Sequence, residues 1–476
     1  MIKSRRKELR YMLILLSLFI TTSLISCHQP LSSEDDSLVM NLANKNQATE
    51  IVSQETGVLT IWWYDGYVEA EKTFLKKIVR DWEKNNGKKI QLVFFDQKQL
   101  LKEIEAAVKS GATPDITVDR TQLVTRLAWQ GKLKDVSAIV EPVLNSFPKA
   151  ILKNSYQYNN LTKEKSYYAV PIYQEGVYFH YWRDVLEELG YSAADIPQDW
   201  DGFWQFWLKI DKQLPPKQQI FALGLPTSPY STDTFLFFEH ILEAYDIRIL
   251  NSRNQLLTKN PKTRQGIIKA LKWWAKLYQD EYIPPSALVW DNSDNNSSFY
   301  NRVVAMTPNP TLSIPASRAE ESDVYFKQIA TVAFPHKPNG QPMTYITRVR
   351  QALVFADRNL SDATSFLSYL IQPEVLADYM EAAGGRFFPA NKANWDDPFW
   401  TNPEDPHISI VRKMLTESPT RPHYFSDNPA YMEVLEKNVW GQALYSILAE
   451  DLSPEMAADK AISQINQIFN QWKSNK

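Results

Sequence analysis

Three short runs of β-branched and aromatic residues alternate with helical patterns between residues 58 and 131, and this alternation limits the possible folds more than any other feature of the sequence. The three runs are residues 58–64, 89–95 and 115–118. Apolar residues recur at helical spacing between them, as at Phe74, Ile78 and Trp82. Because strands that alternate with helices pair mostly in parallel, the sequence predicts an α/β fold for this region.

The chain of 476 residues is long enough for two or three folded units, and similar patterns continue after residue 160. Extended segments are predicted at residues 168–173 and 176–181, on either side of a turn. Helices are predicted at residues 184–189, 199–210, 235–245, 262–278, 361–383 (as two helices), 429–449 and 454–472. The aromatic residues of the second of these helices are expected to be buried core: Trp200, Phe203, Trp204, Phe206 and Trp207.

Charge and motif content exclude several classes of function. The 52 Lys and Arg residues against 55 Asp and Glu residues give a net charge of −3, so the sequence indicates no basic surface for nucleic acid. It contains no GxSxG, HExxH or phosphate-binding loop motif, and its six His residues show no metal-ligand spacing. With one Cys, neither an intramolecular disulfide nor a Cys-based metal cluster can form. No catalytic residue, metal site or cofactor is therefore predicted.

Residues 1–26 have the organisation of an export signal. Residues 1–10 contain five basic residues and one acid, and the uncharged apolar stretch 11–25 that follows is too short for a membrane span. It leads into Leu24-Ile-Ser-Cys27, which resembles a bacterial lipobox and implies cleavage before Cys27 and acylation of this residue by lipid such as palmitate. A short N-terminal anchor and an ordinary signal peptide are the alternatives. Residues 27–56 are expected to place the acylated Cys at the start of a flexible tether.

Several segments that follow one another in order carry a family resemblance. They are residues 59–63, 111–116, 128–135, 168–172, 177–184, 196–200, 301–306 and 385–390. None is specific alone, but their order and spacing, together with the lipobox, resemble the extracellular solute-binding proteins of bacterial ABC importers. Within that group the likeness is to the sugar-binding families related to maltose-binding protein. One departure is Tyr345-Ile-Thr-Arg-Val-Arg350, which replaces a usual glycine pair, so a narrower cleft or a smaller ligand is expected.

The resemblance implies an α/β fold of the two-lobe, type II periplasmic-binding-protein kind, in which a hinge lets two α/β lobes close on a ligand. The lobes expected are residues 57–168 plus 300–346 and residues 169–299 plus 347–476. It further implies an exported, lipid-anchored monomer that binds a sugar or sugar-like solute without a cofactor and delivers it to ABC permease subunits in the membrane. Two alternatives stay open: an exported carbohydrate-active hydrolase, which needs only a pair of carboxylates, and a tethered solute sensor.

Sugars are held by aromatic faces and by charged or amide groups, and in open α/β sheets ligands bind beyond the carboxyl ends of the strands. The residues predicted to contact ligand therefore lie at strand ends and near the expected lobe crossings: Trp63, Tyr64, Asp65, Asp96, Asp119, Tyr173, Glu175, Tyr230, Trp290, Asp291, Asn309, Arg348 and Arg386. The positions of Asp119 and Trp290 also resemble ligand-facing positions of the family. Alternatives stay open for others, since Trp63 can be core, Asp96 can cap the next helix, and Arg348 can form an interlobe salt bridge.

Overall fold

The structure is a computed structural model that describes residues 57–66, 68–217, 219–358, 360–426 and 428–474. The predicted signal peptide, the lipidation residue Cys27 and the predicted tether lie outside the described residues and stay predictions. Among the described helices, none has both the length and the hydrophobicity needed to cross a membrane.

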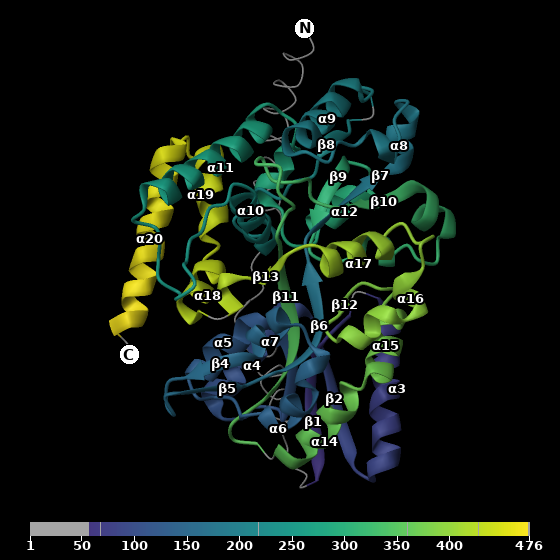
Figure 1. Cartoon of the computed structure of the whole chain (residues 1–476), viewed down its shortest axis with the longest axis vertical. Coiled ribbons are helices and arrows are strands. Elements are labelled where there is room, and N and C mark those ends of the chain that lie inside the picture. The colour runs from purple at the N-terminus through teal and green to yellow at the C-terminus, as the bar shows by residue number, and fades with distance from the viewer. Residues whose placement is uncertain (1–56, 67, 218, 359, 427, 475–476) are drawn as a thin grey trace, which may run out of the picture. The chain divides into compact units, whose positions relative to one another are not determined.

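The first three strands form the parallel part of a larger sheet, as the alternation of strands and helices predicts (Figure 1). Strand β1 (Val58–Tyr64) lies between β2 (Lys89–Phe95) and β3 (Ile116–Arg120) and is parallel to both. Each strand is followed by a helix: α3 (Glu69–Asn86), α4 (Gln97–Ser110) and α5 (Thr121–Trp129). Ile78 and Trp82, which recur at helical spacing, are both buried, at 2% and 1% exposed.

Within the described residues, four later strands complete the larger sheet: β6 (Val170–Gly176), β11 (Tyr345–Val354), β12 (Phe388–Pro389) and β13 (Thr420–Pro422). The strand order is β12-β6-β11-β3-β1-β2, with β13 beside β11. Strand β11 is antiparallel to both β3 and β6, so the larger sheet is mixed rather than parallel throughout. All ten residues of β11 are buried, because the strand lies inside the sheet.

A smaller sheet is formed by strands in the order β10-β7-β9-β8: β7 (Tyr178–Trp182), β8 (Phe221–Leu223), β9 (Val304–Asn309) and β10 (Ile329–Val332). Helix α9 (Trp200–Gln213) packs on this sheet. Phe179 of β7 contacts Phe203 and Trp204 of the helix, with ring centroids 5.4 and 5.8 Å apart. The predicted aromatic core is confirmed, since its members are 8% exposed or less: Trp200, Phe203, Trp204, Phe206 and Trp207.

The remaining helices surround the two sheets (Figure 1). Those before residue 301 are α6 (Ser137–Val140), α7 (Lys149–Ser155), α8 (Arg183–Glu188), α10 (Thr232–Ala244), α11 (Pro261–Gln279) and α12 (Asp294–Tyr300). Those after it are α13 (Ser313–Ala316), α14 (Leu360–Leu370), α15 (Pro373–Ala382), α16 (Pro398–Thr401), α17 (Ile408–Glu417), α18 (Pro429–Glu436), α19 (Val439–Leu448) and α20 (Pro454–Ser474). A hairpin of β4 (Tyr156–Asn159) and β5 (Glu164–Tyr167) lies beside α5.

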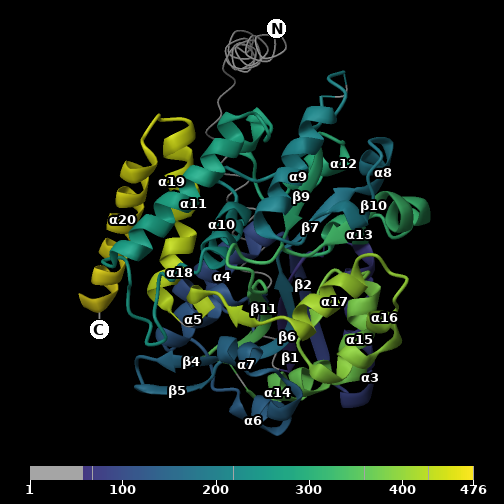
Figure 2. The ribbon, with the colours of Figure 1, turned by 45° about the horizontal axis from the view of Figure 1, so that its top comes forward.

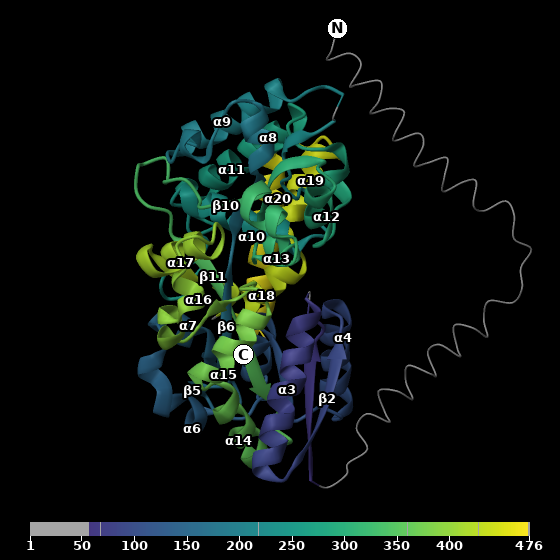
Figure 3. The ribbon, with the colours of Figure 1, turned by 90° about the vertical axis from the view of Figure 1, so that its right-hand side faces the viewer.

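The chain passes between the two sheets along a nearly continuous strand, because Val177 alone separates β6 from β7. Figure 3 shows β6 and β11 running from the lower part, which holds the larger sheet, toward the upper part with the smaller sheet. This pairing differs from the predicted lobe ranges. Strands β9 and β10, predicted in the lobe of residues 57–168 plus 300–346, pair within the smaller sheet. Strand β6 and most of β11, predicted in the lobe of residues 169–299 plus 347–476, belong to the larger sheet. A hydrophobic run identifies a strand, but long-range contacts select its partner.

Candidate functional site

The carboxyl ends of strands from both sheets meet where the chain crosses between them. Because β11 is antiparallel to both β3 and β6, the parallel strands β1, β2 and β3 run in the direction of β6 and end toward Gly176. Strand β9 is parallel to β8 and antiparallel to β7, and Asn309 at its end pairs with Tyr178. The loops after β1, β2, β3, β8 and β9 therefore converge on residues 176–178. We call these loops and the crossing the strand-end site, the kind of position at which α/β sheets bind ligands.

Three predicted acids lie at the carboxyl ends of β1, β2 and β3, on the larger-sheet side of this site. Asp65 is exposed and forms an ion pair with Lys72, whose Nζ lies 2.8 Å from Oδ1 of the acid. Asp96 is also exposed, and its Oδ1 accepts the backbone N–H of Gln99 at 3.0 Å, which confirms the alternative that it caps α4. The backbone of Asp119 belongs to β3, whereas its side chain lies outside the described part of the chain. Each described carboxylate keeps acceptor capacity toward solvent.

A buried cluster around Tyr64 lies behind these acids. Its hydroxyl donates to Oε2 of Glu71 at 3.3 Å and accepts from the hydroxyl of Tyr173 at 3.3 Å and from Nη1 of Arg386 at 3.5 Å. Nη1 of Arg386 also donates to Oε1 of Glu71 at 2.9 Å. Tyr173 stacks on Phe387, with ring centroids 4.1 Å apart. Burial raises the pKa of Tyr64 to about 12, against a lowering effect of Arg386, so the phenol stays protonated and can donate its hydrogen bond.

A second buried cluster lies at the crossing itself, around Glu175. Its carboxylate accepts hydrogen bonds from Nε of Arg348 and from Nε of Arg350, the latter at 3.1 Å, and the three side chains are at most 3% exposed. Nη1 and Nη2 of Arg348 have no hydrogen-bond partner among the described residues, so the contact with Glu175 balances the charge of this guanidinium. The guanidinium of Arg350 lies 4.1 Å from the ring centroid of Tyr64, which joins the two clusters.

The predicted residues on the smaller-sheet side differ in exposure. The amide of Asn309 is buried and hydrogen-bonded. Trp290 is 4% exposed, and its Nε1 lies 3.2 Å from Oγ of Ser286. Asp291 accepts hydrogen bonds at 2.7 and 2.8 Å from its own loop. Tyr230 is 69% exposed and therefore offers an aromatic face to solvent.

The predicted residues thus form an exposed and a buried group. The exposed members are Asp65, Asp96 and Tyr230. The buried members are Trp63, Tyr64, Tyr173, Glu175, Trp290, Asn309, Arg348 and Arg386, while Asp291 is half-buried. Trp63 is 1% exposed and packs edge to face on Tyr379, with ring centroids 6.1 Å apart, as its core alternative expects. In this structure the side chains of the buried group contact other parts of the protein, whereas those of the exposed group face solvent.

Two members of the buried clusters are not among the predicted ligand contacts. Glu71 lies in the first turn of α3, 315 positions from its partner Arg386, a separation at which no local pattern operates. Arg350 lies two residues after Arg348 and thus on the same face of β11, as the period of two in a strand requires. The two-residue spacing between Arg348 and Arg350 is therefore the sequence feature that could have identified Arg350 as a member of the cluster.

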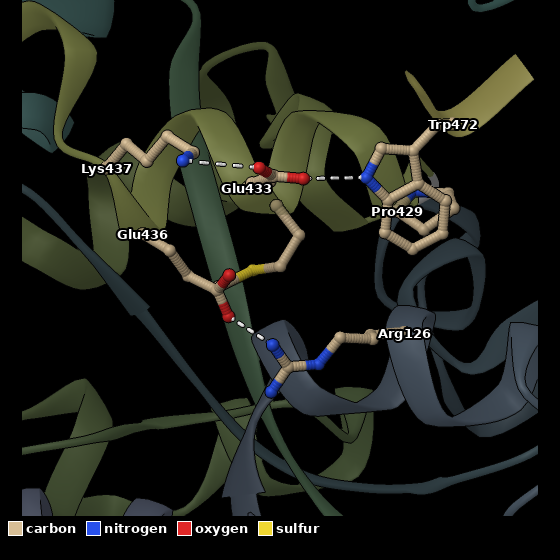
Figure 4. A pocket seen from close by; sticks show the side chains of 7 residues that line it. Arg126, Pro429, Glu433, Glu436, Lys437 and Trp472 are labelled. Carbon is tan, nitrogen blue, oxygen red and sulfur yellow. Dashed lines mark hydrogen bonds and ion pairs between the residues drawn. The ribbon is translucent and has the colours of Figure 1, made fainter. Parts of the chain in front are cut away.

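A cavity of about 290 Å³ lies between α5 and α18. Figure 2 shows these helices beside each other, and we call the cavity the α5–α18 cavity. It is lined by Arg126, Pro429, Met432, Glu433, Glu436, Lys437 and Trp472. In Figure 4, Arg126 reaches from α5 toward Glu436 of α18, and Trp472 of α20 borders the cavity on another side. Arg126 and Glu436 are 310 positions apart, so sequence patterns do not associate them.

The sequence matches the model of the bacterial extracellular solute-binding protein family over residues 77–408. The chain belongs to this family. Solute-binding proteins capture their ligands without converting them, which confirms the prediction that the chain is not an enzyme. No curated protein matches the chain by sequence.

Solved structures of solute-binding proteins have the same fold as this one. An ABC-transporter solute-binding protein from Thermotoga lettingae, solved with α-D-tagatose, is 18% identical with a TM-score of 0.72, over 87% of this chain and 100% of that chain. Maltose-bound MalE3 of T. maritima is 16% identical with a TM-score of 0.69, over 86% of this chain and 99% of that chain. A ribitol complex from Agrobacterium radiobacter is 18% identical with a TM-score of 0.68, over 87% and 99%. These similarities confirm the predicted two-lobe periplasmic-binding-protein fold.

Proposed function

We propose that this solute-binding protein captures a sugar or sugar-like solute at the strand-end site and delivers it to the permease of an ABC importer. The observation that carries the proposal is the convergence of strand ends from both sheets on the crossing, in a chain of this family. The exposed carboxylates of Asp65 and Asp96 accept hydrogen bonds from hydroxyl groups, and Tyr230 offers a ring to the CH face of a sugar. Tagatose, maltose and ribitol, the ligands of the similar structures, are all polyhydroxylated.

Capture follows from the way the two lobes are connected. Val177 between β6 and β7, and residues 333–344 between β10 and β11, are the segments at which the lobes can rotate. A solute that touches strand ends of both sheets gains contacts in the closed arrangement that the open one lacks, so it shifts the population toward closure. The buried clusters at Tyr64 and Glu175 hold the strand ends in position during this movement.

The proposed lipid anchor on Cys27 gives a first expected result. Replacing Cys27 by Ser removes the thiol to be acylated, so the exported protein should move from the membrane fraction to the soluble fraction. Its sugar affinity should stay unchanged, because Cys27 is not among the predicted ligand contacts. Fractionation and mass spectrometry of the purified protein measure both, with Ser32→Ala in the proposed tether as the control. Wild-type protein whose residue 27 carries no lipid by mass spectrometry contradicts the proposed anchor.

A thermal-shift panel tests sugar capture. The panel contains tagatose, ribitol, maltose, acarbose and neutral mono- to tetrasaccharides, and the sugars are recovered and analysed afterwards. Ligand at about 100 times Kd stabilises the folded state by about 2.7 kcal/mol, which raises Tm measurably. We expect a rise with one class of neutral sugar that is recovered intact. No rise with any member contradicts the proposed ligand class, and conversion of the sugar would contradict capture without catalysis.

Uptake separates an importer from a tethered sensor. Cells that lack the protein should lose accumulation of the labelled sugar that gives the largest thermal shift. The full-length protein should restore it, and Cys27→Ser protein should restore it less well. Unchanged uptake in the deletion strain would favour the sensor.

A further inference from the structure

Glu71 lies beneath the loop that carries Asp65 at the strand-end site. This loop has only four residues, 65–68, between the end of β1 and the first residue of α3. Glu71 is in the first turn of α3 and is 1% exposed, so its carboxylate is turned away from solvent. A carboxylate stays buried in its charged form only where other groups bind it. The groups that bind Glu71 therefore indicate why it is buried here.

Both oxygens of the Glu71 carboxylate are bound by the protein. Oε2 accepts the hydroxyl of Tyr64, the last residue of β1, at 3.3 Å. Oε1 accepts a hydrogen bond from Nη1 of Arg386 at 2.9 Å. The backbone N–H of Glu71 donates to the carbonyl of Val68, the last residue of the loop, at 3.0 Å. Glu71 is thus joined to the residue before the loop and to the end of the loop.

The backbone of the loop lies directly on this carboxylate at Gly66. A Cβ atom on Gly66 would be 2.6 Å from Oε2 of Glu71 and 2.9 Å from its Cβ, which is closer than non-bonded atoms approach. Glycine permits this close approach because it has no side chain. Since Gly66 directly follows Asp65, the side chain of Glu71 sets the path of the loop next to the exposed acid.

The side chain of Asp65 is oriented from the same turn of α3. Its backbone N–H extends the pairing of β1 with β2 by donating to the carbonyl of Phe95 at 2.5 Å. Nζ of Lys72, the residue after Glu71, lies 2.8 Å from Oδ1 of Asp65. Because these two side chains are 22% and 44% exposed, the ion pair alone holds Asp65 weakly. The placement of the loop on the first turn of α3 therefore decides where Asp65 points.

We propose that Glu71 is a positioning residue for solute capture, which binds no solute itself but holds the loop so that Asp65 meets the hydroxyl groups of the solute. The inference rests on the proposed function, in which Asp65 contacts the solute. A side chain that is already oriented loses less conformational entropy on binding, and a displacement of about 1 Å breaks a hydrogen bond. Loss of the Glu71 carboxylate should therefore weaken binding, and it should do so through Asp65.

A double-mutant cycle in sugar affinity tests this role. Tagatose, ribitol, maltose and maltotriose are titrated by calorimetry into the wild-type protein, Glu71→Gln, Asp65→Asn and the double variant. For the sugar that binds, Glu71→Gln should weaken the affinity about fivefold or more when Asp65 is present. In the Asp65→Asn background it should weaken the affinity less than about twofold. Equal weakening in both backgrounds, or none in either, would overturn the positioning role.

Replacing Gly66 by Ala displaces the loop without removing a charge. The added Cβ cannot stay 2.6 Å from Oε2 of Glu71, so the loop should move and the same sugar should bind several-fold more weakly. This effect should also depend on Asp65 and be absent in the Asp65→Asn background. Gly66→Ala decides the test if Glu71→Gln protein does not fold, and wild-type affinity in this variant would overturn the positioning role.

Two acids serve as controls that separate position from stability. Asp81→Asn changes an exposed acid of α3, whereas Asp211 of α9 is 8% exposed and its Oδ1 accepts the backbone N–H of Ala222 at 3.0 Å. Asp211→Asn should lower Tm, and both variants should keep the wild-type Kd. A loss of affinity in Asp211→Asn as large as that in Glu71→Gln would mean that destabilisation alone weakens binding, which would overturn the positioning role.

Failure of the proposed function gives a different result in the same experiment. Wild-type protein that binds none of the four sugars, or Asp65→Asn protein with the wild-type affinity, contradicts solute contact at Asp65 and with it the basis of this inference. If Asp65→Asn weakens binding and Glu71→Gln does not, the proposed function stands and the positioning role is wrong.

Discussion

Replacing Glu175 by Gln is expected to lower the free energy of unfolding by about 3–5 kcal/mol, because it removes one partner from a buried ion pair. The carboxylate has no exposed surface and lies against Nε of Arg348 and Nε of Arg350. The amide cannot balance the two guanidinium charges, and neither arginine can turn to solvent from the interior of the sheet. Unfolding in urea, followed by Trp fluorescence and circular dichroism, measures the loss.

An exposed ion pair provides the control for Glu175. Asp81 lies 3.0 Å from Nζ of Lys77, and these side chains are 44% and 53% exposed. Asp81→Asn should therefore cost less than about 1 kcal/mol. Equal losses for Glu175→Gln and Asp81→Asn would show that the buried cluster does not hold the crossing together.

Acidification is expected to destabilise the protein below about pH 4.5 through Glu243 of α10. This carboxylate has no exposed surface and pairs with Arg248, with Lys337 at 2.9 Å and with Arg421 at 2.8 Å. Burial alone would raise its pKa, but the arginines and Lys337 outweigh burial and lower the pKa from 4.5 to about 2. A lowered pKa means that the stabilisation is complete above the unfolded value near 4.5 and is lost as the pH falls through about 2. The difference between these two pKa values corresponds to about 3 kcal/mol in the free energy of unfolding.

Glu243→Gln should therefore lower the free energy of unfolding at pH 7 by about 3 kcal/mol and flatten its dependence on pH below 4.5. Urea unfolding of both proteins at a series of pH values measures this. Glu404→Gln, at an exposed acid, should leave the curve unchanged. If Glu243→Gln protein loses stability on acidification as steeply as the wild type, another carboxylate dominates the acid response.

Much of the secondary structure of this fold can be predicted from sequence, because helices and strands depend largely on residues that are neighbours in the chain. The alternation of strands and helices predicts the parallel pairing of β1 with β2 and β3, and Gln372-Pro373 lies at the predicted break between α14 and α15. The sheet to which β9 and β11 belong is not predictable in this way, since each strand has a hydrophobic pattern that either sheet could accept. Their partners are chosen by packing between distant segments.

The candidate site could be predicted as a location but not as a set of contacts. Asp65 and Asp96 directly follow the carboxyl ends of β1 and β2, as expected. The same rule also selects Tyr64 and Glu175, which the fold buries and pairs with Arg386 and Arg348. Sequence gives no measure of such burial, because the partners come from segments that are far apart along the chain. The α5–α18 cavity is hidden for the same reason.

Calorimetric titration of tagatose, ribitol, maltose and maltotriose into the wild-type protein and Asp65→Asn tests the central claim most directly. We expect one of these sugars to bind with one ligand per chain. A hydrogen bond to a carboxylate contributes about 1.5–3 kcal/mol, so Asp65→Asn should weaken that sugar about tenfold or more. Asp81→Asn should bind it like the wild type. Absence of sugar binding, or equal affinity in Asp65→Asn, would contradict sugar capture at the strand-end site.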